Sequence, residues 1–175
     1  HPAMKFVGPV RRSLKLKTFF NLLGPMVNPG KPKNQLVGVY NREVQDLYHG
    51  VYKNLGINYC ILYSLDGYDE ISLTGNFRAV SSQEDITYSP ESIGFKICNP
   101  NDLFGGNTVE EAVKIFRNIL EGSGSAAQVD AVLVNSAFAL KCITPAKELE
   151  DCIAIARESL IGKKALRSFK KLIEI

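Results

Sequence analysis

The feature that most constrains this fold is a strand, helix, strand pattern in the first third of the chain. Residues 35–40 form a short apolar run of strand length. Asn41 then stands in an N-cap position before apolar residues at helical spacing up to Leu55, and Gly56 is placed to end that helix. A second buried strand is predicted over 59–63. Strands joined by such a helix are expected to lie parallel in a right-handed crossover, which predicts an α/β protein.

The residues after the second strand predict that the sheet is mixed, and only partly parallel. Shorter apolar runs occupy 71–74, 77–80 and 85–88, and the polar segments between them have hairpin spacing. We therefore expect an antiparallel extension of the sheet.

The second half of the chain predicts helices that flank this sheet. The expected helices are 109–120, the apolar stretch 126–142, and a final pair that begins at Pro145 and continues over 163–173 after a break at Gly162. Asn107 or Thr108 is in position to cap the first of these helices, and Thr144 is in position to cap the last pair.

Length and charge limit the protein classes that need to be considered. A chain of 175 residues with 45% hydrophobic residues is expected to form one domain with one core. The net charge of +3 is mild, and the lysines and arginines are scattered apart from Arg11-Arg12 and the C-terminal tail. Nucleic acid is therefore not required as a partner, and a site for an anionic small molecule fits as well.

Cysteine usage and hydropathy predict a cytoplasmic protein. The four cysteines form no CxxC pair and have no metal-ligand spacing. Cys60 and Cys98 lie in apolar contexts that are typical of buried, reduced thiols, which favours an intracellular compartment. No apolar run approaches the roughly 20 residues needed to span a bilayer.

An acidic pair, Asp69 and Glu70, is the first candidate for chemistry. It follows directly on the second predicted strand, and ligands of open parallel sheets bind beyond the carboxyl ends of the strands. Two carboxylates in a loop can present oxygens to Mg²⁺, which needs only one or two of them when a substrate supplies phosphate oxygens. The alternative is an acidic hairpin loop in water.

Arg11 is the second candidate. A guanidinium binds a carboxylate or a phosphate through two parallel hydrogen bonds, but from the residues alone a surface arginine beside another surface arginine is the favoured interpretation. His1 could act as a pocket donor or base, whereas His49 lies mid-helix with no partner evident. Gly24-Pro25 is a rigid turn that could wall a ligand or end a helix.

Several segments resemble one enzyme family in the same order along the chain. They are His1-Pro2-Ala3-Met4-Lys5, Val10-Arg11, Phe20-Asn21-Leu22-Leu23-Gly24-Pro25, Asn28-Pro29, residues 35–40, Asp66-Gly67-Tyr68-Asp69-Glu70-Ile71-Ser72, Asp102-Leu103, Gly105-Gly106 and Asp130-Ala131-Val132-Leu133-Val134-Asn135. In this respect the chain resembles anthranilate phosphoribosyltransferase of tryptophan biosynthesis. The first block and the Asp-Gly-x-Asp-Glu segment are the most specific parts of the resemblance.

The resemblance implies a fold, a reaction and site residues. It implies an α/β domain of the nucleoside phosphorylase and phosphoribosyltransferase type. The implied reaction moves phosphoribose from phosphoribosyl pyrophosphate to the amine of anthranilate, releases pyrophosphate and uses Mg²⁺. The implied anthranilate-binding residues are His1, Arg11, Gly24 and Pro25, and the implied metal ligands are Asp69 and Glu70. No residue of the chain is assigned a chemical step, because neutralising charge and holding the amine in line could carry most of the rate.

The same resemblance predicts what residues 1–175 lack. Members of the family carry a helical dimer segment and a Gly-rich pyrophosphate loop before the His-Pro block. We therefore expect this chain to be the C-terminal portion of the α/β domain, inactive by itself, from a protein that is a homodimer when whole. Residues 14–17, Leu-Lys-Leu-Lys, also depart from the Leu-Gly-x-Arg that the family carries there.

Two other interpretations are tenable at this stage. A pyrimidine nucleoside phosphorylase would share the architecture but not the anthranilate block. A non-catalytic relative that binds nucleic acid would use the mildly basic surface, although the chain lacks a dense Arg and Lys stripe with interleaved aromatic residues.

Overall fold

The computed structural model describes residues 5–6, 8, 13 and 22–174, and it divides the chain into two compact units, 1–32 and 33–175. Within the described part of the first unit, the short 3-10 helix η1 (Pro25–Val27) begins with a proline, whose ring presets a helical φ. A turn at Asn28 follows, in which the side-chain oxygen accepts a hydrogen bond from the Gly30 N–H at 2.9 Å.

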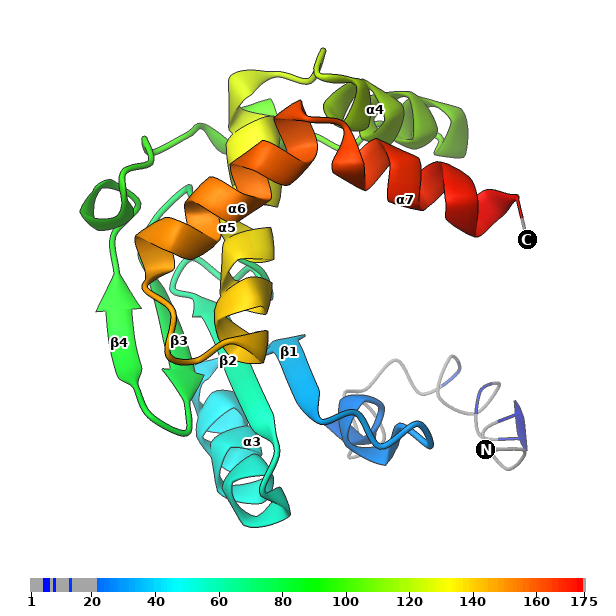
Figure 1. Cartoon of the computed structure of the whole chain (residues 1–175). Helices are drawn as coiled ribbons and strands as arrows, with labels where there is room; N and C mark the ends of the chain where they lie inside the picture. The colour runs from blue at the N-terminus through cyan, green and yellow to red at the C-terminus, as the bar shows by residue number, and fades with distance from the viewer. Residues whose placement is uncertain (1–4, 7, 9–12, 14–21, 175) are drawn as a thin grey trace. The chain divides into compact units, whose positions relative to one another are not determined.

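The second unit is built on a four-stranded sheet whose strands follow chain order (Figure 1). The strands are β1 (Asn34–Gly38), β2 (Asn58–Ser64), β3 (Phe77–Ser81) and β4 (Asp85–Tyr88). β1 pairs parallel with β2, β3 pairs antiparallel with β2, and β4 pairs antiparallel with β3. The predicted mixed, partly parallel sheet is therefore confirmed.

Helix α3 (Arg42–Leu55) makes the connection between the two parallel strands. The Asn41 side chain accepts a hydrogen bond from the Val44 N–H at 2.9 Å, and Gly56 ends the helix in the left-handed conformation with φ 64°. Both termini were predicted from these residue types.

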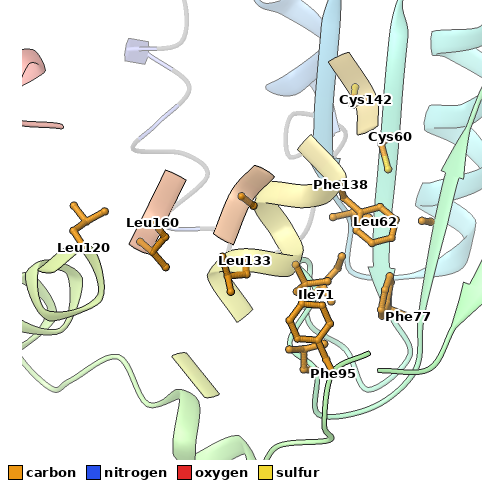
Figure 2. Packing of buried hydrophobic residues seen from close by; sticks show 14 residues of the cluster. Cys60, Leu62, Ile71, Phe77, Phe95, Leu120, Leu133, Phe138, Cys142 and Leu160 are labelled. Carbon is orange, nitrogen blue, oxygen red and sulfur yellow. The ribbon is translucent and has the colours of Figure 1, made fainter. Parts of the chain in front are cut away.

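The two faces of the sheet are covered by different helices. On one face, alternate strand residues such as Cys60 and Leu62 join a core with helix α5 (Ala126–Ile143), as Figure 2 shows. On the other face, Ile61 lies beneath α3, where the fully buried Gln45 donates a hydrogen bond to its carbonyl at 2.8 Å. The period of two along β2 thus sorts its side chains between two layers.

The remaining helices follow the sheet in the chain. They are the 3-10 turns η2 (Glu91–Ile93) and η3 (Pro100–Leu103), then α4 (Val109–Glu121), α5, α6 (Leu149–Ile161) and α7 (Lys164–Ile173). Thr108 caps α4, accepting a hydrogen bond from the Glu111 N–H at 3.2 Å. α4 lies beside α7 (Figure 1). The rings of Phe116 and Phe169 meet there edge to face, with their centroids 5.0 Å apart.

Among the described helices, α5 is the one whose length and composition alone would suit a membrane span, with 18 residues and mean hydropathy 1.3. Its contacts explain this apolar character differently, because it packs on β1, β2 and α6. Leu133, Val134 and Phe138 are buried in the core there. α5 is therefore long and apolar because it forms part of the hydrophobic core of the second unit.

Two predicted elements are wrong. Residues 71–74 do not form a strand, because Ile71 bonds to a side chain of α5 and Leu73 has a left-handed φ of 60°. The predicted helix start at Pro145 is also wrong: α6 begins at Leu149, and Thr144, which was expected to cap it, is the C-cap of α5. Residues 144–147 close a turn instead, and the Lys141 ammonium donates a hydrogen bond to the Lys147 carbonyl at 2.9 Å.

The four cysteines carry free thiols. Cys60, Cys142 and Cys152 are buried, whereas Cys98 is only partly buried and differs in this from the prediction. Burial raises the pKa of each of these thiols.

Candidate functional site

The predicted acidic pair lies in a tight loop that leaves the end of β2. We call residues 65–70 the carboxylate loop. It is closed by backbone hydrogen bonds from the Gly67 N–H to the Ser64 carbonyl at 2.9 Å and from the Ser64 N–H to the Tyr68 carbonyl at 3.1 Å. Gly67 takes a φ of 101°, which favours glycine. The side chains of Asp69 and Glu70 are exposed, so both carboxylates are available to a ligand.

The loop lies directly over the end of the neighbouring parallel strand. A Cβ placed on Gly38, the last residue of β1, would come within 1.3 Å of the Asp69 carbonyl oxygen. Only a glycine permits this contact, which brings the acidic pair to the carboxyl ends of β1 and β2. This is the edge of a parallel sheet where ligands bind, as the sequence predicted.

Two side chains from outside the loop hold its far end. The Ser64 hydroxyl at the end of β2 donates a hydrogen bond to the Glu70 carbonyl at 2.6 Å. Asn135 of α5 accepts a hydrogen bond from the Ile71 N–H at 3.1 Å and donates one to the Ile71 carbonyl at 2.8 Å. Asn135 was assigned no role from the sequence. Its signal was a single asparagine in the middle of the apolar stretch 126–142.

A third carboxylate of the loop, that of Asp66, already has a hydrogen-bond partner. Asp66 accepts a hydrogen bond from the Thr74 hydroxyl, which lies 2.7 Å from the Ser72 hydroxyl. Asp66 therefore braces the connection to β3, while Asp69 and Glu70 make no salt bridge among the residues described.

A groove of about 420 Å³ opens beside Glu70. Its lining residues come from the carboxylate loop and the segment after it, from η3, and from helices α4 and α5; they are Tyr68, Glu70, Ile71, Ser72, Leu103, Ile115, Ile119, Gln128, Ala131, Val132, Asn135 and Ser136. Glu70 thus lines a recess of small-molecule size, and Asp69 precedes it in the chain.

The donor set suits one kind of metal ion. Within the part of the chain that the structure describes, no group of three or more His, Cys, Asp or Glu residues could hold a metal. Zinc sites of that kind therefore have no counterpart there. Two exposed carboxylates fit Mg²⁺, which keeps several waters and shares its oxygens with substrate phosphates.

The other predicted site residues belong to the first unit. His1, Arg11 and residues 14–17 lie outside the described residues. Gly24 is the N-cap of η1 and Pro25 is its first residue. The rigid turn predicted at Gly24-Pro25 is therefore present, and it begins a short helix.

The remaining polar groups of note serve the fold. Arg78 of β3 makes a two-pronged pair with Asp85, with both N···O distances at 2.7 Å, and also bonds to Asp46 of α3 at 2.8 Å. The guanidinium holds the pKa of Asp85 below its usual value. His49, which had no evident partner in the sequence, lies 3.0 Å from the Tyr59 hydroxyl.

A mixed sheet with an acidic loop over the carboxyl ends of its parallel strands places this chain among the α/β domains that bind ligands at that edge. The sequence profile of the glycosyl transferase family, a/b domain, matches residues 1–166. The chain belongs to this family.

Similar proteins bear one name. The chain is 49% identical over 175 residues to an anthranilate phosphoribosyltransferase from Phocaeicola vulgatus, covering 100% of this chain and 53% of that protein. It is 47% identical, with the same coverage, to the enzyme of that name from Bacteroides fragilis. The chain thus spans about half the length of the curated relatives it matches.

Solved structures agree with this likeness. The crystal structure of anthranilate phosphoribosyltransferase from Thermus thermophilus superposes with a TM-score of 0.88 at 30% identity, over 98% of this chain and 51% of that one. The Saccharomyces cerevisiae enzyme, in complex with PRPP and Mg, has a TM-score of 0.89 at 24% identity over 99% and 50% of the two chains, and supports the fold alone.

Proposed function

We propose that this chain is the C-terminal portion of the α/β domain of an anthranilate phosphoribosyltransferase. The observation that carries the proposal is the likeness to enzymes of that name, which extends over the entire chain at up to 49% identity. The exposed acidic pair supports it, because it lies over the carboxyl ends of parallel strands beside a groove. The reaction is transfer of phosphoribose to the anthranilate amine with release of pyrophosphate.

In this proposal Asp69 and Glu70 hold Mg²⁺ against the pyrophosphate of the substrate. When bound, the ion neutralises the charge that develops on the departing pyrophosphate. The carboxylates fit this task because they are exposed and adjacent. We choose Mg²⁺ as the ion because the Saccharomyces cerevisiae enzyme, which shares this fold, was solved in complex with PRPP and Mg.

The residues that we propose to bind anthranilate belong to the first unit. Arg11 pairs with the anthranilate carboxylate, His1 lines the pocket, and Gly24 and Pro25 pack beside the ring. A guanidinium suits this task because it binds a planar carboxylate with two hydrogen bonds. The proposal extends to a cytoplasmic homodimer as the whole protein, in which the rest of the chain supplies the Gly-rich loop.

A fusion protein tests this function. The chain is joined to the part of the Phocaeicola vulgatus relative that it does not match, and anthranilate consumption with phosphoribosyl pyrophosphate and Mg²⁺ is followed by fluorescence. We expect the fusion to be active and the 175-residue chain alone to be inactive. The double variant Asp69→Asn, Glu70→Gln is expected to lose about 10²-fold or more of the rate.

The control is another adjacent and exposed acidic pair, at the start of α6. The double variant Glu150→Gln, Asp151→Asn removes the same charges and is expected to keep the activity of the fusion. A fusion that leaves anthranilate unchanged, or that cleaves a pyrimidine nucleoside with phosphate, contradicts the proposed reaction. A double variant at 69 and 70 with full activity contradicts the metal assignment.

A further inference from the structure

One side chain of α5 forms hydrogen bonds with the backbone that directly follows the acidic pair. Asn135 accepts a hydrogen bond from the Ile71 N–H at 3.1 Å and donates one to the Ile71 carbonyl at 2.8 Å. Both backbone groups of a single residue are therefore satisfied by one amide, in the way a neighbouring strand would satisfy them. Ile71 itself is 1% exposed.

The asparagine amide is fixed at both ends. Its nitrogen also donates to the Ala131 carbonyl one turn earlier in α5, at 2.8 Å. The amide orientation is defined, because the Ile71 N–H requires an acceptor and the Ile71 carbonyl requires a donor. Leu133 and Val134 beside it in the helix are 1% and 0% exposed, so Asn135 is held on a tightly packed helix. We call its two hydrogen bonds to Ile71 the clamp.

The clamped residue is covalently next to Glu70. On its other side, the Glu70 carbonyl accepts a hydrogen bond from the Ser64 hydroxyl at 2.6 Å, and the Asp69 carbonyl abuts Gly38. With these contacts in place, Asn135 supplies the only two hydrogen bonds to Ile71 that the described residues show from a side chain.

We propose that Asn135 is a positioning residue, which holds the Asp69 and Glu70 carboxylates in the geometry that binds Mg²⁺. This inference rests on the proposed function for its metal readout. Groups that orient metal ligands from outside the coordination sphere commonly matter about 10- to 100-fold for metal affinity or activity. Asn135→Ala removes both hydrogen bonds to Ile71 and keeps both carboxylates, so it changes the geometry of the site without changing its charge.

Two measurements test this role. In the active fusion, Asn135→Ala is expected to raise the Mg²⁺ concentration that gives half-maximal rate by about tenfold. In the 175-residue chain, the Ile71 amide is expected to exchange with solvent roughly tenfold faster. Asn135→Asp keeps the acceptor for the Ile71 N–H but places a carboxylate against the Ile71 carbonyl, so it should also raise the Mg²⁺ requirement.

The matched control is Asn54→Ala in α3, whose exposed side-chain amide donates a hydrogen bond to the Gly50 carbonyl one turn earlier at 2.9 Å and does not line the groove. It should leave the Mg²⁺ requirement and the Ile71 exchange rate unchanged. Far-UV circular dichroism establishes that each variant is folded, and Asn135→Asp takes the place of Asn135→Ala if the latter unfolds.

The outcomes separate this role from the proposed function. If Asp69→Asn, Glu70→Gln raises the Mg²⁺ requirement but the Asn135 variants do not, the positioning role is overturned. If the acidic double variant has no effect on Mg²⁺, the metal assignment fails. The exchange rate of Ile71 then still decides: faster exchange in Asn135→Ala, which removes the acceptor of the Ile71 N–H, supports the role of Asn135 in holding this backbone, and an unchanged rate refutes it.

Discussion

The contact between β1 and the carboxylate loop predicts a large effect for a single methyl group. In Gly38→Ala, the new Cβ would stand 1.3 Å from the Asp69 carbonyl oxygen and 2.5 Å from its carbonyl carbon. Ordinary contact begins near 3.4 Å, so the backbone of Asp69 must retreat by about 2 Å. The obstacle is main chain, and no side chain can rotate to relieve it.

Two magnitudes follow from this displacement. Overpacking of this kind costs about 1 to 3 kcal/mol of unfolding free energy. A misplacement of reacting groups by about 1 Å can cost roughly 10²-fold in rate, so we expect at least that loss in the active fusion. The backbone at Gly38 has no left-handed φ, so the cost arises from the contact and not from the conformation.

The assay is urea denaturation of the chain, followed by the activity of the fusion. Gly50→Ala is the matched control, because a Cβ on this glycine of α3 meets nothing within 4 Å. It should stabilise the chain by about 0.5 to 1 kcal/mol through helix propensity. A Gly38→Ala chain with wild-type stability and a wild-type rate in the fusion would refute the reasoning.

Two further predictions concern charge and the thiols. Arg78→Met should lower the unfolding free energy by about 1 to 2 kcal/mol at pH 6, because it removes the partner of Asp85 and leaves Asp46 with only the 3.7 Å pair to Arg42. The pKa of Asp85 lies below its ordinary 3.8 in the folded chain, so the contribution of this pair is present above about pH 4 and is lost as pH falls through the folded pKa. Urea titrations at pH 6 and pH 3 should therefore show a smaller deficit for the variant at pH 3, and an equal deficit at both would contradict this. Among the thiols, Cys98 should be alkylated first at pH 8, since Cys60, Cys142 and Cys152 are buried; mass spectrometry of the modified peptides gives the order, and early labelling of Cys60 would contradict it.

The parts of the fold that could be predicted are those in which local chemistry and tertiary packing agree. Asn41 and Gly56 end α3 by their own side-chain and backbone preferences, so the crossover was evident in the sequence. Residues 71–74 show the opposite case. Their apolar pattern reflects burial beneath α5, while their backbone bonds go to Asn135 and to Cys98. These partners are distant in the sequence, so the hydrophobic pattern of residues 71–74 could not indicate them.

The candidate site divides in the same way. The position of Asp69 and Glu70 after a buried strand was enough to place them at the carboxyl edge of the sheet. Gly38 and Asn135 could not be linked to them from sequence, because the link is a contact between segments that are 31 and 64 residues apart. The expected start of α6 failed for a similar reason, since Lys141 holds the turn at Lys147.

The three contacts that hold the carboxylate loop share a property with an evolutionary consequence. Gly38, Ser64 and Asn135 all meet main-chain atoms of residues 69–71, and none of them touches a side chain of the loop in these contacts. The placement of the loop is therefore encoded outside the loop. Substrate preference could diverge through new loop side chains while the scaffold stays the same, and a designer could exchange those side chains without rebuilding their support.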